Sequence, residues 1–268
     1  MTRPTVVLVQ NSPTSTAGRL PEWLSDAGVD ARVVQGEDLA AQVPAIEGDD
    51  ATGRVHGLVL LGGGLLPDED DRAPWLPHER ELTVQAARAG VPVLGICLGA
   101  QVVAHVTGGE VTGRSGETEK GMCPVDLLDA AADDALLGGL YRAHGTSPGA
   151  LRMIEHHQDS VTGLPPDAVL LATSDACRVQ AFRVGVAWGV QFHPEAPAER
   201  IGTWDAAELA ASGYDRDAMQ AEAAAHDATN SAQARVLAEA FADVVHRTRP
   251  HVDGRVSGRT RPRRAGVR

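Results

Sequence analysis

Aromatic residues and long apolar runs are scarce in this chain. Phe, Trp and Tyr make up 3% of its 268 residues, whereas hydrophobic residues of all kinds make up 43%. A buried core therefore has to rely on Val, Leu, Ile and Ala. No apolar run approaches the roughly twenty residues that a membrane-spanning helix needs. Residues 1–4 lead into a β-rich run without the basic and apolar regions of a signal peptide, so we expect no membrane partner.

Cysteine is scarce as well. The three cysteines, Cys97, Cys123 and Cys177, cannot all pair within one monomer. Their wide spacing matches neither a zinc ribbon nor a Cys-x-x-Cys motif. A reducing compartment is the simpler setting for such a chain, which predicts a cytoplasmic location. Cys123 and Cys177 lie in apolar runs typical of strands, so we interpret both as structural.

The net charge is −12, which opposes non-specific binding to nucleic acids. We therefore expect no nucleic-acid partner. Residues 248–268 differ from the rest, being rich in Arg, Pro and Gly and poor in apolar residues. This composition is typical of a disordered, solvated tail, although a basic tail could also bind RNA or fold back on the acidic body. We expect a single domain over residues 1–247, with 195–247 as its helical C-terminal part.

Strand and helix patterns alternate over the first hundred residues, which is typical of a parallel sheet with helices on both faces. Residues 111–190 contain short apolar runs separated by turns, which predicts an antiparallel or mixed extension of the sheet. The fold class is therefore α/β, with a mixed, largely parallel central sheet and helices on both faces. The strands predicted in the first half are 5–10, 31–35, 55–61 and 91–96. The predicted helices are 19–27, 78–89, 206–211, 216–225 and 231–245.

The segment around Cys97 has the pattern of a nucleophile at a strand-to-helix turn. An apolar run ends at Ile96, and a helix-compatible run starts near Leu98. Gly95 and Gly99 leave room for a tight turn with a strained backbone. The N-terminus of the helix would point its N–H groups at the sulfur, which favours the reactive thiolate. A small buried cysteine beside a glycine-rich turn would give the same pattern.

A base for such a nucleophile could come from a later strand end. The run 188–192 is typical of a strand, and His193 and Glu195 follow it. In an extended segment, residues i and i+2 lie on the same side. Glu195 could therefore hold the tautomer of His193, while Pro194 stiffens the turn. A surface His and Glu at a strand end is the alternative interpretation.

Three glycines, Gly62, Gly63 and Gly64, follow the buried-type run 56–61. Acyl transfer needs backbone N–H donors aimed at the developing oxyanion, and a glycine loop supplies them without side-chain obstruction. The N–H of Leu98, next to the nucleophile, would be the second donor. An ordinary strand-exit turn is the alternative. A phosphate loop is disfavoured because no Gly-Lys-Ser/Thr follows.

Together these motifs resemble the class I glutamine amidotransferase family. The likeness rests on the strand followed by glycines, on Gly-Ile-Cys-Leu-Gly-x-Gln at 95–101 and on Gly-Val-Gln-Phe-His-Pro-Glu at 189–195. These motifs occur in the order that the family has. Residues 156–165 also resemble the family's His-x-Asp-x-Val stretch. The likeness covers roughly residues 5–195 and is greatest with free-standing members related to the glutaminase part of GMP synthase.

The resemblance implies a flavodoxin-like fold and a catalytic triad of Cys97 as nucleophile, His193 as base and acid, and Glu195 as its orienting partner. Gly63 and Leu98 would supply the oxyanion-hole N–H groups. The implied substrate-binding residues are Gly62, Gly64, Gln101 and His157. For His156 and His157, a loop position without a role is an equal alternative.

The chain departs from the family pattern in places. Gly64 replaces a usual proline, which implies a more mobile oxyanion loop, and residues 114–123 have no clear match. An acidic segment, 67–72, sits beside the predicted site mouth and is expected to be solvated, while His78 and Glu79 are expected at the surface of a helix start. No cluster has metal-ligand spacing, so we expect no metal and no cofactor.

The resemblance implies an enzyme that hydrolyses the glutamine side-chain amide through a cysteine γ-glutamyl thioester and releases ammonia. Too few residues follow Glu195 for an acceptor-activating domain, so a separate synthetase subunit is implied as partner. One alternative is a γ-glutamyl peptide or amide hydrolase or transferase with the same chemistry. Another is a non-catalytic interaction domain, which the intact Cys97 and His193 disfavour.

Overall fold

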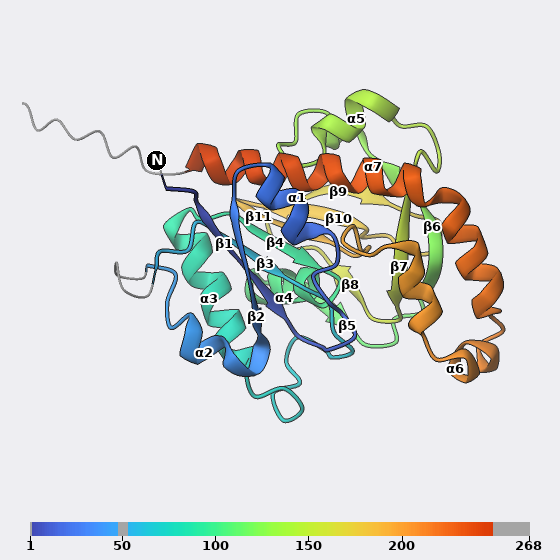
Figure 1. Ribbon diagram of the computed structural model, residues 1–268, viewed down its shortest axis with the longest axis horizontal. Coiled ribbons are helices and arrows are strands. Elements are labelled where there is room, and N and C mark those ends of the chain that lie inside the picture. The colour runs from blue at the N-terminus through green and yellow to red at the C-terminus, as the bar shows by residue number, and fades with distance from the viewer. Residues whose placement is uncertain (1, 48–52, 249–268) are drawn as a thin grey trace, which may run out of the picture.

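One mixed sheet runs through the centre of the molecule (Figure 1). The computed structural model describes residues 2–47 and 53–248, and among these the sheet order is β2-β1-β3-β4-β11-β10-β9-β6-β7. β10 and β6 run opposite to the other strands, so the predicted mixed, largely parallel sheet is confirmed. Its strands are β1 (Thr5–Gln10), β2 (Asp30–Gln35), β3 (Gly57–Leu60), β4 (Val93–Ile96), β6 (Glu119–Leu127), β7 (Leu151–His157), β9 (Val169–Thr173), β10 (Ala181–Val184) and β11 (Ala187–Val190). Two further strands, β5 (Glu110–Thr112) and β8 (Ser160–Gly163), pair with each other.

Helices cover both faces of this sheet. Alternate residues of β1 point to opposite faces: Val6 and Leu8 join one hydrophobic core, and Val7 and Val9 join the other. Burial on both faces explains why the central strands are continuously apolar. The first core is closed by α1 (Leu20–Asp26), α5 (Gly138–His144) and α7 (Arg216–Thr248), and the second by α2 (Leu39–Gln42), α3 (Leu76–Ala89) and α4 (Leu98–Val106). The remaining elements are α6 (Ala206–Ala211) and the 3-10 turns η1 (Gly36–Asp38), η2 (Asp129–Ala131) and η3 (Ala198–Thr203).

The C-terminal part of the chain differs from the sequence prediction. Two helices were expected at 216–225 and 231–245, but α7 continues from Arg216 to Thr248. The intervening residues contain no Gly or Pro, and tertiary contacts hold them. Asp227 pairs with Arg19 and accepts a hydrogen bond from the Ala198 N–H, and Asn230 donates to the Arg152 carbonyl. These contacts outweigh the weak helix propensity of Asp and Asn.

The predicted tail at 248–268 lies outside the described residues, apart from Thr248, which ends α7. Among the described helices, none combines the length and apolarity that crossing a bilayer requires.

The parallel strands β3, β4 and β11 are neighbours in the sheet, so their carboxyl ends lie at one edge. Gly62, Cys97 and His193 follow these three strands directly or within three residues. Open α/β sheets place their sites at this edge. The fold thus brings the three predicted motifs together, although long stretches of chain separate them.

Candidate active site

Cys97 sits on a strained turn between β4 and α4. Its backbone has φ 53° and ψ −108°, a conformation that costs free energy for a residue with a side chain. A Cβ at Gly95 would overlap the backbone of Gly99, and a Cβ at Gly99 would overlap the carbonyl of Leu60. The glycines therefore permit the helix to start tightly against the strand. Cys97 is 7% exposed and is the N-cap residue of α4, which starts at Leu98.

His193 and Glu195 form a buried pair beside this turn. The imidazole Nδ1 lies 2.8 Å from the Glu195 carboxylate Oε1, and the two residues are 6% and 0% exposed. The backbone N–H of His193 donates to the carbonyl of Ile154 on β7 (2.8 Å). Burial raises the pKa of Glu195, but the charge and hydrogen bond of His193, with Arg200, outweigh it and leave the pKa lowered. The orienting contact predicted from the His-x-Glu spacing is therefore formed.

The His193 ring also lies next to Cys97. An ideal Cβ at Gly62 would lie 2.8 Å from Cε1 of His193 and 3.5 Å from Cβ of Cys97, so both side chains flank the same glycine. Burial opposes a charge on His193, but Glu195 and Cys97 outweigh it and raise the pKa of His193 to about 10. A protonated imidazole is the partner that stabilises a cysteine thiolate.

The glycine loop lies across from the start of α4. A Cβ at Gly63 would lie 3.0 Å from the Leu98 side chain and 3.2 Å from Cβ of Asn11. The loop and the residue after the nucleophile are thus neighbours, as an oxyanion hole requires. A cavity of about 100 Å³ opens beside them, lined by Gly63, Gly64, Cys97, Gln101 and His157, among others.

Gln101 is well placed to contact a molecule in this cavity. The residue is 2% exposed, and its Nε2 donates to the carbonyl of Asp159 (3.1 Å). Its Oε1 is buried and has no hydrogen-bond partner among the described residues, which is unusual for a buried polar atom. His157 lines the same cavity, but its Nε2 lies 3.5 Å from carboxylate oxygens of Glu119 and of Glu155.

The comparison with known proteins decides the family. The model of the family described as glutamine amidotransferase class-I matches residues 14–203. The chain belongs to this family. The glutamine-hydrolysing GMP synthase subunit of Pyrococcus furiosus is 30% identical over 192 residues, which cover 71% of this chain and 89% of that protein. Its counterpart in Haloarcula marismortui is 37% identical over 176 residues, 64% of this chain and 76% of that protein.

A solved structure confirms the flavodoxin-like fold of this class I amidotransferase. The crystal structure of a glutamine amidotransferase from Thermotoga maritima matches with a TM-score of 0.74 at 23% identity, covering 90% of this chain and 99% of that one.

The sequence did not predict the buried hydrogen bonds that hold the start of the glycine loop in this amidotransferase. Asn11 Nδ2 donates to the Leu61 carbonyl (3.2 Å) and to Glu79 Oε1 (3.1 Å), and Trp75 Nε1 donates to Asn11 Oδ1 (2.8 Å). Glu79 is fully buried rather than at the surface, because it reaches this network from α3. Burial, only partly offset by Asn11, raises the pKa of Glu79 to about 7. The helix pattern alone carried no signal for this inward-facing carboxylate.

Arg200 was missed as well. Its Nη1 lies 3.2 Å from Glu195 Oε1, and its guanidinium donates to the carbonyls of Thr14 and Thr16. It thus ties the Glu195 carboxylate to the loop after β1, and only the fold brings these segments together.

The acidic segment 67–72 is largely exposed, as expected, with Asp68, Asp71 and Arg72 on the surface, but ion pairs also hold it. Arg80 binds Asp70 through two hydrogen bonds of 2.7 and 2.8 Å. Glu69 accepts from the Leu66 N–H and pairs with Arg72. These contacts fix one wall of a cavity that Gly64, Glu69 and Arg72 line next to the glycine loop.

Proposed function

We propose that this chain hydrolyses the side-chain amide of glutamine through a γ-glutamyl thioester on Cys97 and passes the ammonia to a separate synthetase subunit. The observation that carries the proposal is the strained Cys97 beside the buried His193–Glu195 pair at the edge of a lined cavity. We also propose that residues 1–247 form one domain, because a single sheet spans both the parallel half and the later strands.

The proposed reaction has two halves. His193 takes the thiol proton of Cys97 as the sulfur attacks the amide carbon, and the C–N bond then breaks as His193 gives that proton to the departing nitrogen, which leaves as ammonia. His193 next takes a proton from water, whose oxygen attacks the thioester carbon and releases glutamate and the free thiol. Glu195 keeps the imidazole oriented and offsets its positive charge in both halves.

Both halves pass through a tetrahedral oxyanion. The backbone N–H groups of Gly63 and Leu98 are the proposed donors to it. The packing of Gly63 against Leu98 supports this assignment. Gly62, Gly64, Gln101 and His157 are the proposed substrate-binding residues, since all but Gly62 line the cavity, and Gly62 lies between the base and the nucleophile.

The nature of the relatives supports a separate synthetase. The two GMP synthase relatives described above are named as subunits, so in those proteins another chain completes the synthase. We therefore propose that a second subunit consumes the ammonia made here.

A γ-glutamyl amide with a larger leaving group is the second candidate substrate. One observation favours it: His193 lines a further cavity of about 310 Å³, together with His156, Arg200, Trp204 and Glu208, among others. His156 and Trp204 stack there with ring centroids 4.2 Å apart. An amine larger than ammonia could leave into this space when His193 protonates it.

One experiment tests the proposed chemistry. Purified chain is incubated with glutamine and with γ-glutamyl dipeptides, and the ammonia or amine released is measured. The Cys97→Ala variant should lose both activities by on the order of 10⁴-fold or more. A glutamine-like diazo-ketone should label Cys97, as mass mapping would show. Turnover that survives in Cys97→Ala, or labelling at Cys123 or Cys177 instead, would exclude the mechanism.

A further inference from the structure

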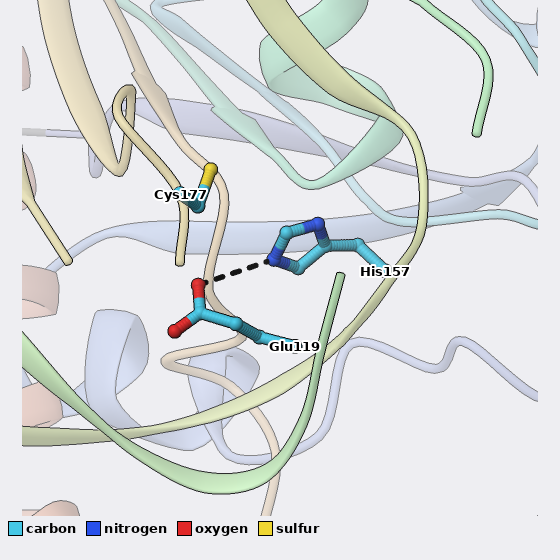
Figure 2. A group of neighbouring side chains, drawn as sticks. All are labelled: Glu119, His157 and Cys177. Carbon is cyan, nitrogen blue, oxygen red and sulfur yellow. Dashed lines mark ion pairs between the residues drawn. The ribbon is translucent and has the colours of Figure 1, made fainter. Parts of the chain in front are cut away.

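A buried cluster of metal-ligating side chains lies outside the triad. Figure 2 shows its three members: Glu119 on β6, His157 on β7, and Cys177 in the turn between β9 and β10. All three are buried, and their candidate ligand atoms lie within 4.8 Å of one another. Cys177 was expected in a strand, but the structure places it in a turn. We call these three residues the Cys-His-Glu cluster.

The backbone holds the cluster in place. Glu119 and His157 are directly opposite each other in the antiparallel pair β6–β7, which puts their side chains on one face. The turn that carries Cys177 is closed by Ser174, whose hydroxyl accepts from the Cys177 N–H (2.9 Å) and whose N–H donates to the Cys177 carbonyl (2.9 Å). The three donors therefore lie on two paired strands and one hydrogen-bonded turn.

Unpartnered polar groups point into the same space. The side chain of His157 is 1% exposed, and neither of its ring nitrogens has a hydrogen-bond partner. Glu155 is 0% exposed, both its carboxylate oxygens lack a partner, and Oε2 lies 3.5 Å from His157 Nε2. Such groups are costly in a protein interior unless something pairs with them. Burial, and then the nearby Glu119, raise the pKa of Glu155 well above its usual range.

We propose that the Cys-His-Glu cluster binds one Zn²⁺ ion, with the carboxylate of Glu155 as the fourth ligand. A thiolate, an imidazole and carboxylates together suit Zn²⁺, whereas Mg²⁺ and Ca²⁺ prefer oxygen ligands alone. In a tetrahedral zinc site the ligand atoms are about 3.5 Å apart. Glu119, His157 and Cys177 have candidate ligand atoms within 4.8 Å of one another, and Glu155 Oε2 lies 3.5 Å from His157 Nε2, so the side chains, above all Glu155, have to close in on the ion when it binds.

Zinc binding would change the protonation and the hydrogen bonds of the cluster. Binding forms a Zn–S bond and releases the thiol proton of Cys177 and the carboxyl proton of Glu155 to solvent. Without the ion, the Cys177 Sγ lies 3.6 Å from Glu117 Oε2 and 3.7 Å from the Val179 carbonyl, and the Zn–S bond would replace these weak thiol contacts. Glu119 Oε2 accepts from Ser174 Oγ (2.9 Å) and Gln180 Nε2 (2.5 Å), and these donors would orient the carboxylate as a ligand.

The ion would join segments that the chain keeps apart. β6, β7 and the β9–β10 turn all contribute ligands, and His157 also lines the cavity beside Cys97. Zinc would thus fix one wall of that cavity. The proposal does not depend on the glutaminase chemistry, because metal content and spectra report it directly.

Metal titration of the full chain tests the site. The purified protein is stripped with a chelator, loaded with Zn²⁺ or Co²⁺, passed through a desalting column and analysed for bound metal. We expect about one Zn²⁺ per chain and, with Co²⁺, the near-ultraviolet thiolate-to-cobalt absorption of a sulfur ligand. We also expect Zn²⁺ to raise the melting temperature of the stripped protein.

Two variants test proposed ligands, and a third serves as their control. Cys177→Ser should lose the cobalt–sulfur band and at least tenfold in Zn²⁺ affinity, and Glu119→Gln, which keeps the shape of the side chain, should lose affinity with the band retained at high Co²⁺. Cys123→Ser is the matched control: its sulfur lies by the Lys120 carbonyl (3.7 Å), and this variant should keep both band and affinity. Circular dichroism verifies that each variant folds.

Two results would overturn the proposal. One is less than a tenth of an equivalent of Zn²⁺ retained by the folded wild-type chain after loading. The other is a cobalt–sulfur band that persists in Cys177→Ser but disappears in Cys97→Ser, which would place the metal on the catalytic thiol.

Discussion

Adding one methyl group at Gly62 should separate the base from the nucleophile while leaving both in the chain. The backbone of Gly62 lies outside the left-handed region, so alanine fits its conformation. The new Cβ, however, would lie 2.8 Å from Cε1 of His193 and 3.5 Å from Cβ of Cys97. The perturbation therefore acts on the His193–Cys97 geometry.

The expected size follows from these distances. Carbon atoms in contact prefer about 3.5 to 4.0 Å, so the imidazole has to retreat by roughly 0.7 to 1.2 Å. A displacement of about 1 Å in a reacting group can cost on the order of 10²-fold in rate. This corresponds to about 2.7 kcal/mol of activation free energy. We expect the loss mainly in kcat, because the added methyl group meets His193 and Cys97 directly, with a smaller rise in KM, because Gly62 is a proposed substrate-binding residue that does not line the cavity.

Steady-state glutaminase kinetics with a coupled glutamate assay measure both parameters for Gly62→Ala. Gly139→Ala is the matched control, since it adds the same methyl group on α5, where the nearest atom belongs to Val236 at 3.2 Å; kcat should stay within twofold of wild type. If folded Gly62→Ala keeps kcat within threefold of wild type, or if the loss lies in KM alone, the inferred closeness of His193 and Cys97 is wrong.

Three further predictions concern the triad and the loop support. Glu195→Gln should lower kcat by about 10²- to 10³-fold, less than Cys97→Ala, since an orienting group is partly replaceable; equal losses in the two variants would refute this order. The pKa of His193 is raised from an ordinary 6.5 to about 10, so its stabilising contribution is complete below pH 6.5 and disappears as the pH rises through 10. The difference in unfolding free energy between wild type and His193→Gln, measured with urea, should therefore shrink over that pH range. A constant difference would contradict the prediction. The pKa of Glu79 is raised from 4.5 to about 7. Ionisation of Glu79 therefore lowers the free energy of unfolding progressively between these pH values, and the full loss is reached above pH 7. Glu79→Gln should then be more stable than wild type by up to about 3 kcal/mol at pH 8 and no more stable at pH 4.5, which thermal melts at the two pH values can check.

Local patterns were sufficient to predict the first half of the fold and the core of the site. The sequence of 95–101 specifies its own turn, because each glycine is required by a contact within a few residues or on the adjacent strand. Glu195 likewise follows His193 so closely that the spacing alone predicts their contact. The alternation of strands and helices up to Ile96 is local in the same way.

The remaining features depend on which distant segments pack together. Glu79 lies on an ordinary helix start, and its burial follows from Asn11 at the end of β1. The Cys-His-Glu cluster depends on the register of β6 against β7 and on the β9–β10 turn, which no spacing in the sequence encodes. The continuity of α7 likewise depends on Arg19 and Arg152, which are far from it in sequence.

The long helix α7 limits where this protein can be truncated at its C-terminal side. The family match ends at residue 203, yet Leu237, Phe241 and Val245 of α7 seal one core against β1 and β3. A fragment cut at the family boundary would leave that apolar face uncovered and prone to aggregation. Expression plasmids for this protein should therefore extend through Thr248.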